Sequence, residues 1–221
     1  MRFNNTDTYG FQHALRGMRN PKNSWDKGDT HVTFGYNADG QRLGIWNETF
    51  VHIGPNDLKL AQTLIRAGSE HRKFLRQITV WVDITAPLYW WKEFDTYKIG
   101  TTANSTSTMH KITSKEITLS DFSVDETQDK EIESYFSEVV ANCEKLREKY
   151  LETKDYKYWK ALIQLLPESY NQTRTVSMNY ENLYTMVRQR KNHKLMEWSV
   201  DFISWVKTLP YAKELIFIDL D

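Results

Sequence analysis

The sequence has little cysteine: Cys143 is the only one among 221 residues. A single cysteine cannot form a disulfide within the chain, and a cysteine-based metal site would need ligands from other chains. Scarce cysteine is typical of the reducing cytoplasm, so the sequence predicts a cytoplasmic location. His71, His110 and His193 lack the spacing of zinc ligands, and we therefore expect no metal.

An excess of charge of one sign is also missing. Lys and Arg total 29, and Asp and Glu total 29, which gives a formal net charge of +0. A neutral chain has no overall field that would attract nucleic acid or an acidic membrane surface, so neither is predicted as a partner. Any site for an anion must be a local cluster of cations.

Long apolar runs are absent as well. The first residues, MRFNNTDTYG, lack the apolar region of a secretory signal. No run approaches the length of a membrane-spanning helix. Both observations agree with the predicted cytoplasmic location.

Internal repeats and low-complexity linkers are missing too, so the sequence predicts one domain over residues 1–221. Aromatic residues are plentiful, at 14%, with eight Trp and twelve Tyr. This content indicates a large core, an interface or a stacking pocket, and we expect most of these side chains to be structural.

Hydrophobic periodicity predicts a mixture of helices and strands. A hairpin with a turn at Asp39-Gly40 is expected within residues 30–53, and Asn56 or Asp57 is expected to cap the next helix. Ile78, Val80, Val82 and Ile84 alternate as in a strand, and residues 101–108 are expected to form a polar loop. The predicted helices cover residues 9–18, 58–67, 88–97, 128–150, 154–166 and 180–209.

The last predicted helix, residues 180–209, carries a cation among apolar residues. Arg190 falls on the apolar stripe that includes Leu183, and His193 and Glu197 follow on the same face. A guanidinium in this position needs an anionic partner, because burying an unpaired charge is costly. The partner is either a carboxylate of the chain or a bound phosphate, and the pattern leaves both open.

The stretch TAPLYWWKEFDTYKIGTTANSTSTMH, residues 85–110, resembles the signature region of the flavin-dependent thymidylate synthases. In that family an Ala-Pro and an aromatic stretch precede Arg-His-Arg, seven further residues and Ser. Here Ala86-Pro87 is present, Thr96-Tyr97-Lys98 occupies the Arg-His-Arg slot, and Thr106 occupies the serine slot. The order and spacing of the motif are kept, whereas the two arginines and the histidine are replaced.

A second resemblance to the family follows later in the chain. The family has Leu-Pro, an Asn on a strand, and then a helix with Leu, Arg and His, and this order is repeated here. The matching residues are Leu166, Pro167, Asn179, Leu183, Arg190, His193 and Glu197. Two further arginines of the family are replaced, one by Ile163 and one by Glu181.

A third resemblance lies at Glu70-His71-Arg72-Lys73, where the family has a histidine that touches the flavin. His71 is the equivalent residue. Arg72, Lys73 and Arg76 add positive charge that suits the phosphates of a dinucleotide. The alternative is a solvated helix end, where cations interact favourably with the helix dipole.

The resemblance implies a fold, ligands and an assembly. The implied fold is of the α/β (α+β) class and ThyX-like, with a central, mostly antiparallel sheet flanked by long helices. The implied ligands are FAD and a pyrimidine nucleotide, and family members assemble as homotetramers. At the positions that match the family motifs, the resemblance implies catalysis by Tyr97 and Thr106. It implies cofactor binding by His71, Arg72, Tyr97, Asn179 and His193. It implies substrate binding by Lys98, Thr106, Ser107 and Arg190.

Two hypotheses for function follow. The first is a divergent flavin-dependent thymidylate synthase-like transferase that binds a pyrimidine nucleotide and FAD. The family methylates dUMP, but losing the signature arginines removes charge-assisted hydrogen bonds worth roughly 1.5–3 kcal/mol each, which favours an altered pyrimidine substrate or another flavin-nucleotide reaction. The second is a non-catalytic nucleotide-binding or self-assembling protein that kept the fold and lost the chemistry.

Overall fold

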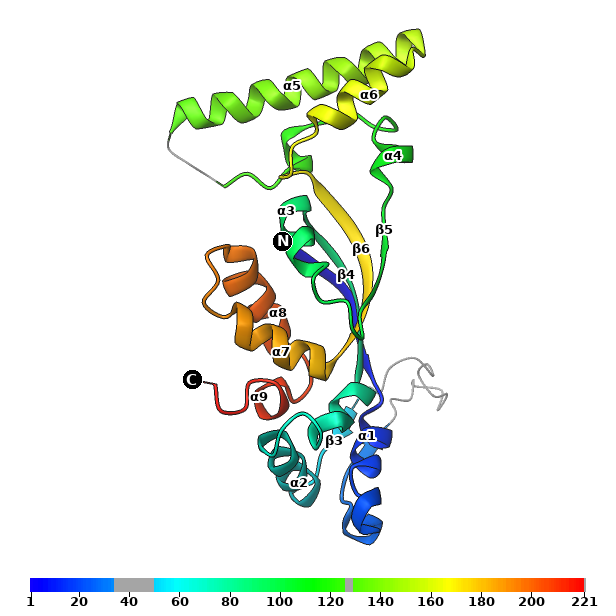
Figure 1. The fold of residues 1–221 in the computed structure, drawn as a ribbon, viewed down its shortest axis with the longest axis vertical. Helices are drawn as coiled ribbons and strands as arrows, with labels where there is room; N and C mark the ends of the chain where they lie inside the picture. The colour runs from blue at the N-terminus through cyan, green and yellow to red at the C-terminus, as the bar shows by residue number, and fades with distance from the viewer. Residues whose placement is uncertain (34–49, 126–128, 221) are drawn as a thin grey trace, which may run out of the picture. The chain divides into compact units, whose positions relative to one another are not determined.

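A computed structural model of the chain describes residues 1–33, 50–125 and 129–220. The chain groups into two compact units (Figure 1). Unit 1 contains Met1–Arg2, Ile84–Thr96 and Asn104–Thr175, and unit 2 contains Phe3–Asp83, Tyr97–Ala103 and Val176–Asp221. Neither unit is one continuous stretch of sequence. That the chain is a single domain stays a prediction.

An antiparallel sheet is built from strands that contribute residues to both units. Its order is β1 (Arg2–Tyr9), β4 (Thr79–Pro87), β6 (Asn171–Asn179) and β5 (Thr102–Ser105). Along β4, Val80, Val82 and Ile84 are buried and alternate with more exposed residues. Branched side chains suit such a pleated surface, and the strand predicted from the alternation is confirmed.

A separate hairpin lies in unit 2, where β2 (His31–Thr33) pairs antiparallel with β3 (Phe50–His52). His31 faces His52, and their rings stack with centroids 4.9 Å apart. Both strands fall within the hairpin predicted for residues 30–53. The predicted turn at Asp39-Gly40 lies outside the described residues.

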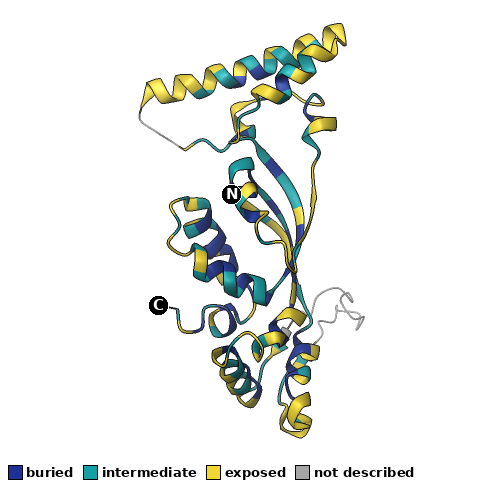
Figure 2. Ribbon diagram, in the orientation of Figure 1, coloured by how far each residue is buried: buried dark blue, intermediate teal, exposed yellow. Residues whose placement is uncertain are grey.

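Unit 2 gathers helices around an aromatic core. Tyr180 is fully buried, meets Phe11 edge to face at 5.4 Å, and donates a hydrogen bond from its hydroxyl to the carbonyl of Pro210 at 2.6 Å. Figure 2 shows buried residues along α7 and α8. The helices are α1 (Phe11–Gly17), α2 (Pro55–Arg66), α7 (Tyr180–Arg190), α8 (Ile203–Lys207) and α9 (Ala212–Leu215), with the short 3-10 helices η1 (Asn20–Lys22), η2 (Trp25–Lys27) and η3 (Arg72–Gln77) and the π-helix η5 (Glu197–Phe202).

Unit 1 contains a long helical hairpin, α5 (Lys130–Thr153) and α6 (Tyr156–Leu165), which pack against each other. The carboxylate of Asp129 caps α5, Lys154 ends it in a left-handed conformation with φ 57°, and Asp155 caps α6. These local signals explain why one predicted helix stops and the next begins here. The remaining elements of the unit are α3 (Leu88–Phe94), α4 (Thr108–Lys111) and the 3-10 helix η4 (Leu119–Asp121).

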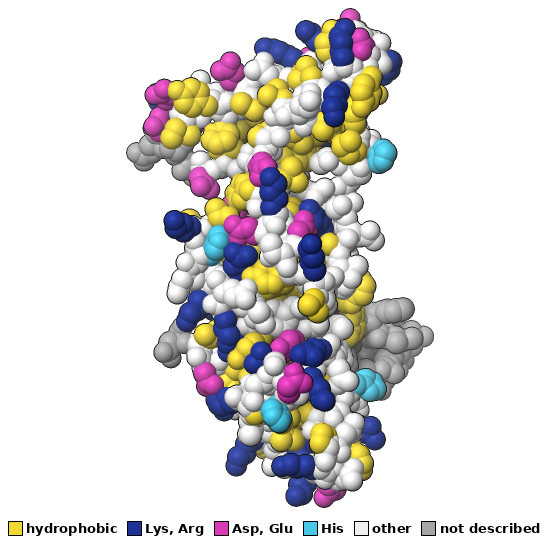
Figure 3. Space-filling view, viewed as in Figure 1, with side chains coloured by type: hydrophobic (Ala, Val, Ile, Leu, Met, Phe, Trp, Pro, Cys, Tyr) yellow, Lys and Arg dark blue, Asp and Glu magenta, His cyan; other side chains and the backbone are white. Residues whose placement is uncertain are grey.

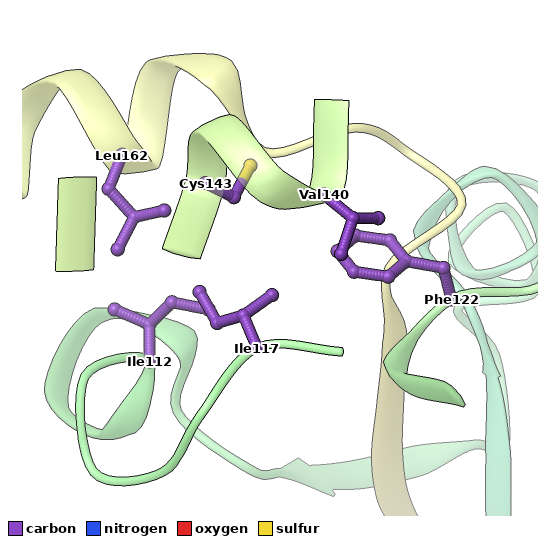
Figure 4. Close-up of a cluster of buried hydrophobic side chains, with 6 residues drawn as sticks. All are labelled: Ile112, Ile117, Phe122, Val140, Cys143 and Leu162. Atoms are coloured by element: carbon purple, nitrogen blue, oxygen red, sulfur yellow. The ribbon is translucent and has the colours of Figure 1, made fainter. Parts of the chain in front are cut away.

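A cluster of buried apolar side chains holds the hairpin to the loop that precedes it (Figure 4). Val140 and Cys143 come from α5 and Leu162 from α6, and they meet Ile112, Ile117 and Phe122. Burial raises the pKa of the Cys143 thiol, so this side chain behaves as a small apolar residue.

The outer surface of the helical hairpin keeps apolar side chains in contact with solvent. Hydrophobic side chains are visible over α5 and α6 in the space-filling view (Figure 3). Ile132 and Tyr135 on α5 are 42% and 57% exposed. Leu151, Tyr156 and Leu165 are also exposed.

Three expectations from the sequence are wrong in detail. The helix expected over residues 180–209 is interrupted after Arg190, because residues 191–195 form turns and bends before the chain becomes helical again at Met196 and η5. Gly54, not Asn56 or Asp57, is the N-cap of α2, since Pro55 starts that helix. Residues 102–105 of the expected polar loop form β5, whose side chains are exposed.

Within the described residues, no helix is long and apolar enough to span a membrane. The same residues contain no group of three or more His, Cys, Asp or Glu side chains placed to hold a metal ion.

Candidate functional site

Arg190, the last residue of α7, lies among aromatic groups of unit 2. Its Nε donates a hydrogen bond to the hydroxyl oxygen of Tyr97 at 2.9 Å. Its guanidinium carbon lies 4.7 Å from the ring centroid of Trp198 and 5.5 Å from that of Tyr97. Cation–π contacts of this kind hold a guanidinium in a fixed plane. Tyr97 and Arg190, predicted as site residues from distant parts of the sequence, therefore meet.

The hydrogen bonds around Tyr97 have a defined direction. A guanidinium has only donors, so the Tyr97 oxygen accepts from Arg190. The Tyr97 hydroxyl then donates to Oε1 of Gln189 at 2.8 Å. Because the carbonyl oxygen of Gln189 takes this bond, its amide NH₂ group is directed elsewhere. The arrangement orients three side chains at the end of α7.

The segment that carries Tyr97 and Lys98 is also attached to the start of α7. Nδ2 of Asn182 donates to the carbonyl of Ile99 at 2.8 Å. Gly100 follows with φ +78°, and a Cβ at this position would come within 2.9 Å of Nδ2 of Asn179. A residue with a side chain would be strained there. Residues 97–100 are thus held at both ends of α7.

Asn179, predicted to bind the cofactor, caps α7. Its side chain accepts a hydrogen bond from the backbone N–H of Asn182 at 3.0 Å, and Asn182 accepts one from the N–H of Asn179 at 3.1 Å. This reciprocal capping box satisfies backbone donors that the first helical turn leaves without partners. The side-chain oxygen of Asn179 therefore already accepts a hydrogen bond within the chain.

Arg72, also predicted at the cofactor, forms an ion pair within the chain. Its Nε lies 3.0 Å from Oε1 of Glu181, and its guanidinium lies 4.4 Å from the ring centroid of Tyr184. Both charged side chains are mostly buried. Arg72 therefore joins η3 to α7 in unit 2.

His193 lies just beyond the end of α7. Its backbone N–H donates to the carbonyl of Arg190 at 3.0 Å, and its Nδ1 accepts from the N–H of Leu195 at 3.2 Å. These bonds form the turn that ends the helix. Lys98 is exposed, and none of the ion pairs found in residues 1–33, 50–125 and 129–220 includes it.

Thr106 and Ser107 belong to unit 1. The backbone N–H of Thr106 donates to the carbonyl of Thr173 at 2.9 Å, and its carbonyl accepts from Nε2 of Gln172 at 2.8 Å. The Ser107 hydroxyl accepts from the backbone N–H of His110 at 3.1 Å and so caps α4. Their roles at a substrate stay predictions.

His71 lies on an open cleft in unit 2 with a volume of about 1330 Å³. The cleft is formed by η1, η2, α2 and η3, and its apolar wall includes Pro21, Leu60 and Leu64. Cationic and imidazole side chains also line it, namely Arg19, Lys22, Lys27, His71, Lys73 and Arg76, together with the carboxylate of Glu70 and the neutral polar residues Asn20, Ser24, Thr63 and Gln77. Neither Arg190 nor Tyr97 is among the residues that line this cleft.

A buried ion pair supports one side of this cleft. Nε of Arg19 lies 2.6 Å from Oδ1 of Asp57, and the two side chains are 5% and 3% exposed. The other oxygen of Asp57 accepts the backbone N–H groups of Asp29 and Thr30 at 3.0 and 2.8 Å. Burial alone would raise the pKa of the Asp57 carboxyl, but hydrogen bonds from Thr30, Arg19 and Asp29 hold it below its ordinary value.

Comparison with solved structures gives a likeness over the full length of the chain. A flavin-dependent thymidylate synthase ThyX from Helicobacter pylori, in complex with FAD and dUMP, superposes with a TM-score of 0.70 and 16% identity, covering 100% of both chains. A second structure of Helicobacter pylori ThyX with FAD and dUMP gives a TM-score of 0.69 and 16% identity, covering 98% of this chain and 97% of the other. The chain has the ThyX fold.

No family model matches the sequence, and no curated protein matches it either. The ThyX fold predicted from the resemblance is thus confirmed by tertiary structure at an identity of 16%. An identity this low leaves the chemistry to be argued from this chain's own residues.

The residues predicted to contact FAD do not fit that role as a set. Arg72 pairs with Glu181, the side-chain oxygen of Asn179 caps α7, and Nδ1 of His193 accepts a backbone N–H. The Tyr97 hydroxyl bonds to Arg190 and Gln189, so four of the five predicted groups have partners within the chain. In this ThyX-fold chain His71 lines the cleft of unit 2, and Tyr97 does not.

Three groups that shape the site of this ThyX-fold chain were not predicted from the sequence. Gln189 fixes the direction of the Tyr97 hydroxyl, Trp198 packs against the Arg190 guanidinium, and Glu181 holds Arg72. Trp198 lies on the apolar stripe of the expected last helix, which was the one available signal. Gln189 and Glu181 carry no local signal, because their partners are remote in sequence.

Proposed function

We propose that this ThyX-fold protein binds a pyrimidine nucleotide at Arg190, Tyr97 and Lys98. The observation that carries the proposal is Arg190 itself, a guanidinium held by the Tyr97 oxygen and by two aromatic rings at the end of α7. An oriented guanidinium recognises a phosphate by paired hydrogen bonds, and the exposed Lys98 beside Tyr97 adds a second cation. The likeness to structures that hold dUMP supports the same ligand class.

The proposal is for nucleotide binding, and it does not extend to the usual methylation of dUMP. Lys98 is a point charge and cannot replace the paired hydrogen bonds of an arginine. Tyr97 occupies the histidine slot, and its hydroxyl already bonds to Arg190 and Gln189. Because the predicted FAD contacts do not fit as a set, no flavin step is derived from them. FAD binding and a transferase reaction are questions for experiment.

The runner-up is a non-catalytic protein that binds a nucleotide as a signal or only assembles with itself. The exposed apolar side chains of α5 and α6, such as Ile132 and Tyr135, support self-association. Both hypotheses include a homo-oligomer, which is expected to be a tetramer. Sedimentation equilibrium without ligand tests this part, and a monomer at micromolar concentration would exclude it.

Thermal unfolding with dUMP, dTMP, other nucleotides and FAD tests the proposal. A ligand present at 100 times its Kd stabilises the folded protein by about 2.7 kcal/mol, which is easily measured. We expect stabilisation by a pyrimidine nucleotide, and we expect Arg190→Ala to remove it at the same ligand concentration. Arg66→Ala, which changes an exposed arginine that pairs with Asp219, is the matched control and should keep the effect.

Each outcome has a definite meaning. Stabilisation by a nucleotide but not by FAD favours a nucleotide-binding protein without flavin chemistry. Stabilisation by both, with flavin absorbance in the bound state, favours the flavoenzyme. Nucleotide binding that survives in Arg190→Ala contradicts the site. No response to any nucleotide contradicts the proposal and leaves the self-assembling protein.

A further inference from the structure

The β2–β3 hairpin of unit 2 brings two histidines together at the surface. His31 and His52 are directly opposite each other across the antiparallel pair, and both are exposed. Their rings stack with centroids 4.9 Å apart and an angle of 20° between the ring planes. Side chains that face each other on neighbouring strands project from the same face of the hairpin, so the pairing keeps the two imidazoles close.

The backbone around His52 is fixed by a single side chain. The Tyr211 hydroxyl accepts a hydrogen bond from the N–H of Ile53 at 2.9 Å and donates one to the carbonyl of Val51 at 3.2 Å. These are the residues on either side of His52. The Tyr211 ring in turn lies 6.3 Å from that of the buried Phe11. His52 is therefore presented from a strand that is tied to the core of unit 2.

The backbone beside His31 is fixed in a similar way. The N–H of the preceding residue, Thr30, donates to Oδ2 of Asp57 at 2.8 Å. Asp57 is buried and held by its ion pair with Arg19. Both histidines therefore project from backbone that is in place before any ligand arrives, which lowers the entropy cost of binding.

The ring nitrogens of the pair are available to a metal ion. Within residues 1–33, 50–125 and 129–220, neither imidazole takes part in a hydrogen bond or an ion pair. Imidazole nitrogens bind Zn²⁺ at about 2.0–2.1 Å, so two of them on one tetrahedral ion lie about 3.3 Å apart. Small rotations about the Cβ–Cγ bonds of two exposed, stacked rings reach this separation.

We propose that His31 and His52 together bind one divalent transition-metal ion of the zinc, nickel or copper class, for which imidazole is a suitable ligand. Water completes the coordination, because the chain supplies two ligands. Spacing along the sequence gives no sign of this site, since the pairing of β2 with β3 is what joins its ligands. The site uses none of the residues assigned to the nucleotide, so the inference does not rest on the proposed function.

Calorimetric titration of the full chain, prepared without a polyhistidine tag, tests the inference with ZnCl₂, NiCl₂ and MgCl₂. We expect one equivalent of Zn²⁺ or Ni²⁺ to bind and no Mg²⁺, which prefers oxygen ligands. His31→Gln and His52→Gln should each lower the affinity for Zn²⁺ at least tenfold, because one imidazole alone cannot chelate the ion. Their unfolding temperatures without metal show whether the variants remain folded.

His110→Gln is the matched control, since His110 is an exposed histidine of unit 1, and it should change the affinity less than twofold. Nuclear magnetic resonance gives a second readout, in which the ring proton signals of His31 and His52 should shift together as Zn²⁺ is added. Unchanged binding in either single variant, an equal loss in the control, equally tight binding of Mg²⁺ or the absence of any binding would each overturn the proposal. Arg190→Ala should leave Zn²⁺ binding unchanged, so failure here and failure of the nucleotide site are distinguishable.

Discussion

At the scale of single residues, the chain places its charged groups in pairs that only the fold reveals. Arg19 and Asp57 are buried together, and Arg72 is held by Glu181. A buried guanidinium keeps its charge, so it must have a partner within reach. Arg190, which is half-buried, contacts the Tyr97 hydroxyl oxygen and the rings of Tyr97 and Trp198. Its contacts leave the guanidinium oriented at the end of a helix.

Asp57→Asn tests the buried pair. The substitution leaves Arg19 buried beside a neutral group, and breaking such a pair costs about 3–5 kcal/mol in the free energy of unfolding. Because the pKa of Asp57 is lowered in the folded state, its contribution is present above the ordinary Asp pKa and is lost as the pH falls through the folded value. The difference between wild type and variant should therefore narrow below about pH 4.

Denaturant unfolding from pH 7 to pH 3 measures this difference. Asp219→Asn is the matched control, since Asp219 pairs with Arg66 at the exposed surface. The control should change stability far less than Asp57→Asn at pH 7. A difference between wild type and Asp57→Asn that stays constant with pH would contradict the role given to the carboxylate.

At the scale of elements, α7 and residues 97–100 are connected by hydrogen bonds at two points. Asn182 connects them through its bond to Ile99, and Arg190 connects them again through Tyr97. The glycine at position 100 permits the close approach to Asn179. Helix caps thus position the candidate site as well as stabilising the helix.

Asn182→Ala tests this connection. It removes the bond to Ile99 and half of the capping box, and each bond contributes about 1 kcal/mol, so we expect a loss of about 1–2 kcal/mol. Hydrogen exchange of the amides in residues 97–101 should become faster. Asn192→Ala, at an exposed asparagine in the turn after α7, is the control and should change neither quantity. Unchanged exchange in Asn182→Ala would show that the segment is held by other contacts.

The sequence predicts where α7 starts but not where it ends. Its start follows from Asn179 and the apolar spacing, but its end at Arg190 does not, because no Gly or Pro marks the position. The turn there depends on the side chain of His193, which accepts the N–H of Leu195. β5 was missed for a related reason: its residues are polar, and a strand of exposed residues lacks the alternation that marks a half-buried strand.

At the scale of the whole molecule, the chain divides into two compact units, each with its own buried cluster. Unit 1 depends on the packing of α5 and α6 over Ile112, Ile117 and Phe122. Leu162 is fully buried there, whereas Leu165 on the same helix is 40% exposed. This contrast allows a direct test of whether the units unfold together.

Leu162→Ala should destabilise unit 1 by about 2–5 kcal/mol, because it removes transfer free energy and leaves a cavity. Leu165→Ala is the matched control and should cost much less. Native-state hydrogen exchange measures the two units separately. Equal loss of protection in both units would favour the single cooperative domain predicted from the sequence, and loss confined to unit 1 would contradict it.

The sequence by itself determined the elements whose causes are local. Alternation along β4 could be read from neighbouring residues, and the resemblance predicted the ThyX fold. Only the tertiary structure decided which candidate residues meet and which already have partners. Arg190 and Tyr97 are 93 positions apart, and Arg72 and Glu181 are 109 apart. Contacts over such separations depend on how the elements pack, and no local pattern encodes them.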